Sequence, residues 1–86
     1  MNKPDSKRVY MSGVETQLIL EAKAGNREAF GRLVGLYGKR VYHTAFSFLH
    51  NVDDAADIVQ EVFLKAYKSL TSFDVSKAFF PWLLFH

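Results

Sequence analysis

Apolar residues recur at steps of three and four along most of this chain, which is the pattern of amphipathic helices. The clearest stripe predicts a helix that starts after Asn26, a good N-cap, and reaches about Phe48. Its apolar positions are Phe30, Leu33, Val34, Tyr37, Val41, Ala45 and Phe48. A second stripe of Tyr42, Phe46 and Leu49 predicts that the C-terminal half of this helix is buried on two sides.

Three glycines, Gly31, Gly35 and Gly38, lie on one flank of the same helix. Each glycine lowers helix stability by about 1 kcal/mol relative to alanine. They indicate either the close approach of a neighbouring helix backbone or simply a weak helix, and the pattern leaves both interpretations open.

Two further amphipathic segments flank this helix. An earlier helix is predicted from about Val14 to Ala24, with Gly25 ending it. Its inward positions are Leu18, Ile19 and Ala22. A later helix is predicted to begin at Asp53 or Asp54, because acids favour a helix N-terminus. Its inward stripe consists of Ala55, Val59, Val62, Phe63, Ala66 and Leu70.

A loop, TSFDVSKA, separates this helix from the C-terminal segment FFPWLLFH. Pro81 is tolerated in a first helical turn, so a fourth helix is predicted to start there. The fold class is therefore all-α, a small helical bundle of three full helices and the start of a fourth. We expect residues 1–13 to be a flexible leader and residues 14–86 to form the helical domain.

Composition narrows the function classes. With 86 residues and no cysteine, the chain suits one small domain without disulfides or thiolate metal sites. No metal or other cofactor is expected, because the three histidines lack ligand spacing and Asp53, Asp54 and Asp57 lack the glycine turn of a calcium loop. No phosphate-cradling glycine loop or acid–base pair suggests an enzyme. Without a signal sequence or membrane-length apolar run, we expect a cytoplasmic protein with no membrane partner.

The polar side of the segment after Asp53 permits two interpretations. Asp57, Gln60 and Glu61 lie opposite the core stripe, and Leu64 falls in the middle of them. Acids near the start of a helix and lysines near its end simply complement the helix dipole. An apolar residue ringed by carboxylates and an amide is also typical of a surface that docks a basic partner helix. Periodicity alone does not choose between these two.

Three segments in order resemble region two of bacterial sigma factors, most closely the extracytoplasmic-function group. They are AKAGNREAFGRLVGLYGKRVY, DDAADIVQEVFLKAYKSLTSFD and AFFPWLL, and the match covers about Leu18 to Trp82. The resemblance implies a transcription initiation factor domain. Such a domain docks on core RNA polymerase and binds and melts the minus-ten promoter element through the non-template single strand.

The resemblance also implies roles for particular residues. Asp57, Gln60, Glu61 and Leu64 would contact the clamp helices of the largest polymerase subunit, which offer arginines. An anti-sigma factor is a further candidate partner.

Promoter DNA would be contacted around the loop Ser72–Ala78, by Ser72, Phe73, Lys77 and Trp82. The resemblance makes Phe73 part of a pocket for an unstacked base, as a ring that stacks on the base or forms a wall. Most aromatic rings in this part of the chain have core packing as the alternative role, and Trp82 could serve the core, the melting surface or both.

The chain departs from the family pattern after Leu83, where Leu84, Phe85 and His86 replace the usual Tyr-Arg-Ile-Ala. We therefore expect the domain to be C-terminally incomplete and the second, helix-turn-helix domain to be absent from this sequence. Whether the chain is a fragment or a truncated form is left open. The alternative function is a helical protein-interaction module that does not bind DNA, such as an adaptor or a degenerate sigma-like scaffold.

Overall fold

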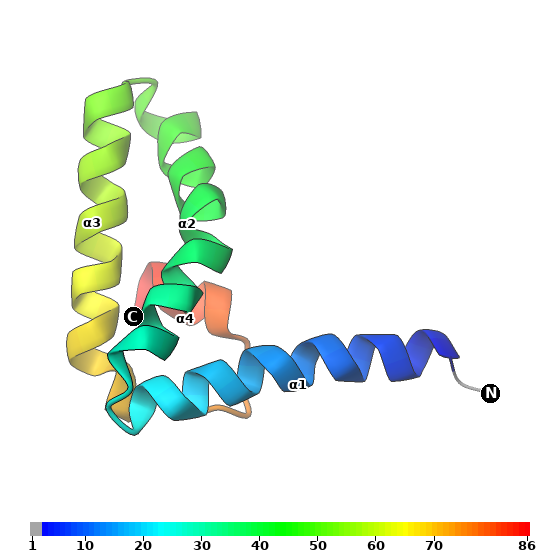
Figure 1. Ribbon diagram of the computed structural model, residues 1–86. Coiled ribbons are helices and arrows are strands. Elements are labelled where there is room, and N and C mark those ends of the chain that lie inside the picture. The colour runs from blue at the N-terminus through cyan, green and yellow to red at the C-terminus, as the bar shows by residue number, and fades with distance from the viewer. Residues whose placement is uncertain (1–2) are drawn as a thin grey trace.

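A computed structural model describes residues 3–86, with side chains from residue 13 onward, and every regular element in this range is a helix. The elements are α1 (Lys3–Lys23), α2 (Arg27–Leu49), α3 (Val52–Ser69), the 3-10 turn η1 (Leu70–Ser72) and α4 (Phe79–Phe85). Helices α2 and α3 form an antiparallel pair, α1 crosses the base of this pair, and the short α4 packs beside its lower half (Figure 1). The predicted all-α bundle with three full helices and a short fourth is confirmed.

The predicted start of the first helix at Val14 is wrong, because α1 extends back to Lys3. Pro4 lies in its first turn, where a missing N–H removes no intrahelical bond. Gly13 lowers helix propensity by about 1 kcal/mol but does not end a helix by itself. Residues 1 and 2 of the predicted leader lie outside the described residues, and the flexibility of residues 1–13 stays a prediction.

Local side-chain chemistry sets the boundaries between the helices. Gly25 adopts a φ of +104°, a conformation that favours glycine, and so ends α1 as predicted. The Asn26 side chain accepts a hydrogen bond from the Ala29 N–H at 3.1 Å, which confirms it as the N-cap of α2. Asn51 does the same for α3, accepting from the Asp54 N–H at 2.9 Å, so α3 begins at Val52, slightly earlier than predicted.

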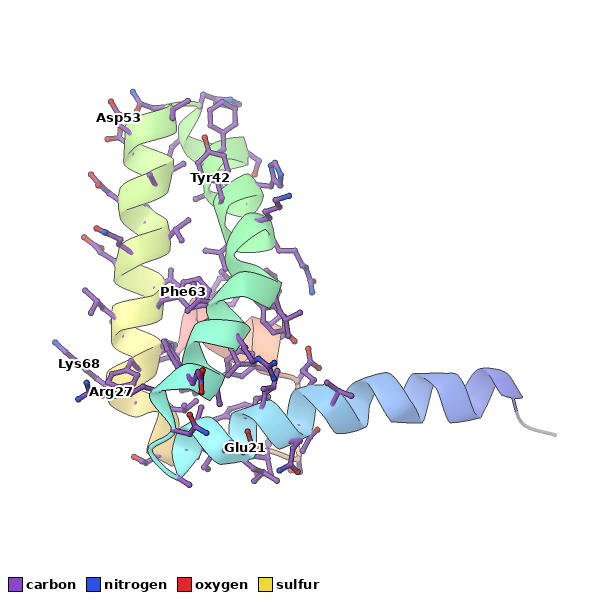
Figure 2. The ribbon with its side chains drawn as sticks, in the orientation of Figure 1. Glu21, Arg27, Tyr42, Asp53, Phe63 and Lys68 are labelled. Atoms are coloured by element: carbon purple, nitrogen blue, oxygen red, sulfur yellow. The ribbon has the colours of Figure 1, made fainter. Side chains whose placement is uncertain are left out.

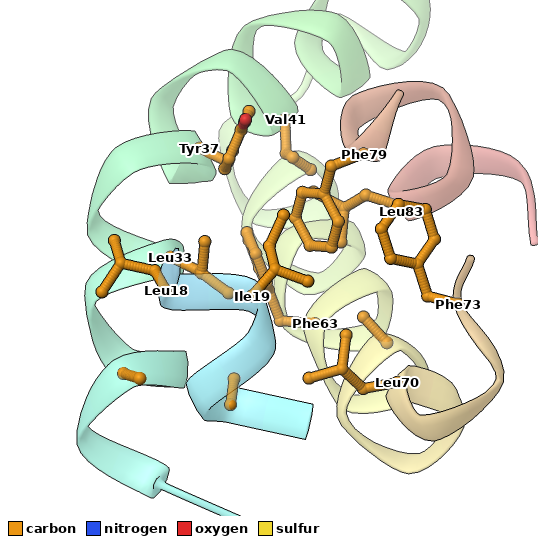
Figure 3. Packing of buried hydrophobic residues seen from close by; sticks show 13 residues of the cluster. Leu18, Ile19, Leu33, Tyr37, Val41, Phe63, Leu70, Phe73, Phe79 and Leu83 are labelled. Atoms are coloured by element: carbon orange, nitrogen blue, oxygen red, sulfur yellow. The ribbon is translucent and has the colours of Figure 1, made fainter. Parts of the chain in front are cut away.

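The core lies where α1, α2, α3 and α4 converge, and Figure 3 shows its side chains meeting between the helices. The largest fully buried side chains are Leu33, Val41 and Leu83. The inward stripes predicted for the three main helices are buried or half-buried, with Phe63 and Leu70 buried and Val59 half-buried against the cluster. The exception is Phe48 at the end of the α2 stripe, which is exposed.

The end of α2 is less buried than its sequence predicts. Phe48 is 79% exposed and Leu49 is also exposed, while Tyr42 and Phe46 are half-buried. The prediction of burial on two sides is therefore wrong. The reason is geometric, because α2 and α3 extend beyond α1 and α4, so only α3 packs against this end of α2 (Figure 1).

The three glycines of α2 do not mark a close helix contact. A Cβ atom placed on Gly31, Gly35 or Gly38 would meet no atom within 4 Å. The interpretation as close backbone approach is wrong, and a locally weakened helix remains. Within the described part of the chain, no helix combines the length and apolar character needed to cross a bilayer.

Candidate functional site

The outer face of α3 carries the first group of predicted site residues. Asp57, Gln60, Glu61 and Leu64 are all exposed and recur at helical spacing, so they share one face. Leu64 is 59% exposed. Polar side chains project from this side of α3 between Asp53 and Lys68 (Figure 2). The predicted exposure of this face is confirmed, whereas its role in docking stays a prediction.

An apolar hollow of about 480 Å³ adjoins this face, in the groove between α2 and α3. Gln60 and Leu64 belong to both the face and the hollow. Tyr67 also lines the hollow, is 44% exposed and packs edge-on against Phe30 at 5.0 Å between ring centroids. The sequence interpretation missed Tyr67, although its position three residues after Leu64 on the same helix was a usable signal.

A second hollow of about 550 Å³ lies between α4 and the loop that precedes it. Ser72, Phe73, Lys77 and Trp82, the four residues predicted to contact DNA, all line it. Its volume falls within the ~300–1,000 Å³ typical of small-molecule pockets, so an unstacked base could enter. The structure thus brings the second predicted group together around one opening. Ala78, Pro81, Phe85 and His86, which the sequence interpretation did not select, complete the lining together with Asp74.

Phe73 forms the inner wall of this hollow rather than an exposed stacking platform. It is 2% exposed, and its ring centroid lies 5.4 Å from that of Phe79 and 4.9 Å from that of Trp82. Of the two roles predicted for Phe73, a wall of the pocket or a stacking ring, this burial favours the wall, because core side chains cover the ring. Its contact with DNA stays a prediction. Trp82 is half-buried and stacks with His86 at 4.2 Å, so it contributes both to the core and to the hollow.

A compact turn shapes the rim of the hollow, which we call the α3–α4 loop (residues 73–78). One carboxylate oxygen of Asp74 accepts hydrogen bonds from the Ser76 N–H at 2.9 Å and the Ser76 hydroxyl at 2.8 Å. These bonds hold the pKa of Asp74 below its usual value, and the charge of Lys77 adds to the effect. The Lys77 N–H donates to the Asp74 carbonyl at 2.9 Å, which closes the turn.

Helix α1 fixes this loop from the other side, because the Lys23 ammonium donates a hydrogen bond to the Phe73 carbonyl. The two residues are 50 positions apart, so no local pattern could have predicted the contact. Lys77 lines the hollow, whereas Lys65 and Lys68 near the end of α3 do not.

Residues 33–85, more than half of the chain, match the family described as Sigma-70 region 2. The chain belongs to the sigma-70 region 2 family. The matched range contains both the outer face of α3 and the hollow beside α4, whereas α1 precedes it.

Relatives of this region 2 domain include sigma factors of the extracytoplasmic-function (ECF) group. The "ECF RNA polymerase sigma factor SigW" of Bacillus subtilis is 38% identical over 65 residues, which cover 76% of this chain and 35% of that protein. The "ECF RNA polymerase sigma-E factor" of Escherichia coli K12 is 36% identical over 66 residues, covering 77% and 34%. The "RNA polymerase sigma factor CnrH" of Cupriavidus metallidurans is 35% identical over 83 residues, covering 96% and 39%. The chain spans little more than a third of the length of these curated relatives.

Proposed function

We propose that this sigma-70 region 2 domain is a transcription initiation module with two binding surfaces. The outer face of α3 docks on the clamp helices of the largest subunit of core RNA polymerase. The hollow beside α4 receives a base of the non-template strand when the minus-ten promoter element melts. The observation that carries the proposal is the exposed Leu64, flanked on one helical face by two carboxylates and an amide.

The α3 face has the chemistry to bind a basic helix. Exposed Asp57 and Glu61 can form charge-assisted, bidentate hydrogen bonds with arginine, and Gln60 can donate and accept beside them. Leu64 and the adjoining apolar hollow offer a place for an apolar side chain between those polar contacts. An apolar centre with a polar rim is the usual anatomy of a protein interface.

The hollow beside α4 supports the DNA role. Extruding a base from a duplex costs a few kcal/mol, which contacts inside the pocket must offset. Trp82 and Phe85 supply apolar and aromatic surface for the base, while Ser72 supplies a hydroxyl at the rim. Lys77 is exposed at the same rim, where it can bind a phosphate of the strand.

The proposed role is one of binding, and we assign no catalysed reaction to this domain. A domain that works on polymerase and promoter acts in the cytoplasm, which is the location that we propose. We retain an anti-sigma factor as a further proposed partner, in keeping with the ECF relatives.

The docking surface can be tested by affinity capture of core RNA polymerase on the immobilised domain. Asp57→Lys combined with Glu61→Lys should abolish capture, because the reversed charges repel arginines. Glu28→Lys is the matched control. Glu28 is also exposed. It lies one helical turn before Arg32 on α2, and Arg32 lines a hollow formed with α1. Glu28 is therefore on the side of α2 that faces α1 and not α3.

The folded state of each variant is checked by its melting curve, since exposed substitutions usually change stability by about 0.5 kcal/mol or less. Equal capture by the double variant and the wild type would exclude the α3 face as the docking surface. Capture of polymerase without any binding to a pre-melted promoter would instead favour the alternative of an interaction module that does not bind DNA.

A further inference from the structure

A third hollow of about 610 Å³ is lined by residues of α1, α2, α4 and the α3–α4 loop. Polar atoms make up a larger share of its wall than of the wall of the hollow that contains Trp82. Its charged groups are Arg40 from α2, Lys77 from the loop and Glu15 from α1. The roles inferred above do not use Arg40 or Glu15.

Arg40 is held in place by aromatic rings although its side chain is exposed. Its guanidinium carbon lies 3.9 Å from the centroid of the Phe80 ring and 5.9 Å from that of Tyr37. The Tyr37 and Phe80 rings themselves stack at 5.9 Å with an interplanar angle of 21°. A guanidinium over an aromatic ring keeps its N–H donors in its own plane, where they can bind a phosphate. Because the rings restrain the side chain, binding costs less conformational entropy than for a mobile arginine.

The third hollow and the hollow beside α4 are neighbours. Lys77, Ala78 and Pro81 line both of them and form the ridge between them. A strand whose base enters the hollow beside α4 can therefore continue across this ridge into the third hollow. Arg40 lines only the third hollow, so its charge favours that path for the anionic sugar–phosphate backbone.

We propose that the third hollow binds the phosphodiester backbone of the melted non-template strand next to the extruded base, with Arg40 and Lys77 as its phosphate ligands. This inference rests on the proposed function, since it assumes that a base occupies the neighbouring hollow. The inference adds a path for the DNA strand to the proposed function. On this path the strand crosses the ridge formed by Lys77, Ala78 and Pro81 and continues toward α2.

Glu15 should weaken the binding of DNA to the third hollow. Its carboxylate lies on the α1 side of the same hollow and opposes the binding of an anion. Asp74, the other acid near this loop, has one carboxylate oxygen engaged by two hydrogen bonds from Ser76. Removing the charge of Glu15 should therefore strengthen DNA binding, whereas a purely structural role for Arg40 predicts no such gain.

The test uses the domain bound to core RNA polymerase and a pre-melted promoter as the probe, with affinity measured over a series of salt concentrations. Arg40→Gln should weaken binding about threefold, as for an exposed charge contact, and should lower the slope of log affinity against log salt by about 0.7. Arg40→Lys should restore most of the slope, because it keeps the charge. Lys39→Gln is the control, because Lys39 is the exposed neighbour of Arg40 but does not line the hollow.

Glu15→Gln should strengthen binding by about twofold or more, an effect of the size expected for one charge at the surface, since Glu15 is only half-buried. Replacing single phosphates of the probe with neutral methylphosphonates should locate the contact. At the linkage next to the extruded base, the difference between wild type and Arg40→Gln should disappear.

An unchanged salt slope in Arg40→Gln, or a Glu15→Gln variant that binds no more tightly, would overturn the inference. In either case wild-type binding to the melted strand would leave the proposed function standing. Failure of the wild type to bind the melted strand at all would overturn both.

Discussion

Replacing Phe73 can show whether its ring packs in the core or stacks on a DNA base. The structure places the ring inside the core. The ring is 2% exposed and packs against Phe79 and Trp82. Phe73→Ala should therefore lower the free energy of unfolding by about 3–5 kcal/mol. A chain of 86 residues has about 4–13 kcal/mol of stability in total, so much of the domain should unfold.

Urea unfolding followed by tryptophan fluorescence would measure this loss, since Trp82 is the single tryptophan and contacts Phe73 directly. Phe85→Ala is the matched control, because Phe85 lines the same hollow but is 81% exposed. Its stability should change by about 0.5 kcal/mol or less. A loss below about 1 kcal/mol in Phe73→Ala would show that the ring is not part of the core.

Phe73→Leu then tests the contact with DNA. Leucine keeps most of the buried volume, so the variant should fold with a loss of about 1–2 kcal/mol, including the lost ring pairing. Its affinity for a pre-melted promoter should stay within about twofold of wild type, because a buried ring does not stack on a base. A folded Phe73→Leu variant that bound the promoter more than about tenfold less tightly would refute this reasoning, since a lost base-stacking contact costs ~1–3 kcal/mol.

Two further predictions concern α2 and the α3–α4 loop. Gly35→Ala should raise the free energy of unfolding by about 0.5–1 kcal/mol, because a Cβ there meets no atom within 4 Å; a lower melting temperature would contradict this. Ser76→Ala removes the hydroxyl bond to Asp74 but keeps the backbone N–H bond, which lowers the pKa most, so it should raise the pKa of Asp74 only part of the way toward the ordinary ~3.9, measured by NMR titration of the carboxylate. Because the pKa of Asp74 is lowered in the folded state, its contribution to stability is present above about pH 4 and is lost as the pH falls through the lowered pKa. An unchanged titration in the variant would rule out a contribution from the Ser76 hydroxyl.

Much of the fold could be predicted because local chemistry decides helix position. The Asn26 cap and the Gly25 stop were readable from single residues, and the structure confirms both. The inward stripe of α3 followed from helical periodicity alone. The start of α1 was predicted wrongly because Pro4 and Gly13 both weaken a helix in general, although neither position prevents one here.

The candidate sites also contain residues that the sequence could place and residues that it could not. Residues on one helix, such as Asp57 and Leu64, were placed on a common face by their spacing, and the structure finds them exposed. The choice between the two roles of Phe73 could not be made from its own segment, because the exposure of its ring depends on Phe79 and Trp82, which reach it from the next element. Spacing along one segment does not report which rings a later helix will cover.

The sequence by itself determined the helical periods, the caps and the acidic face of α3, because each depends on residues within a few turns of one another. Only the tertiary structure decided which aromatic side chains are covered and which cations gather at a common hollow. Arg40 lies 37 residues before Lys77, yet both line one hollow because α2 and the α3–α4 loop pack together there. The hydrogen bond from Lys23 to the Phe73 carbonyl joins residues that are 50 positions apart. Such pairs are set by how the helices pack, which depends on the whole core rather than on any one segment.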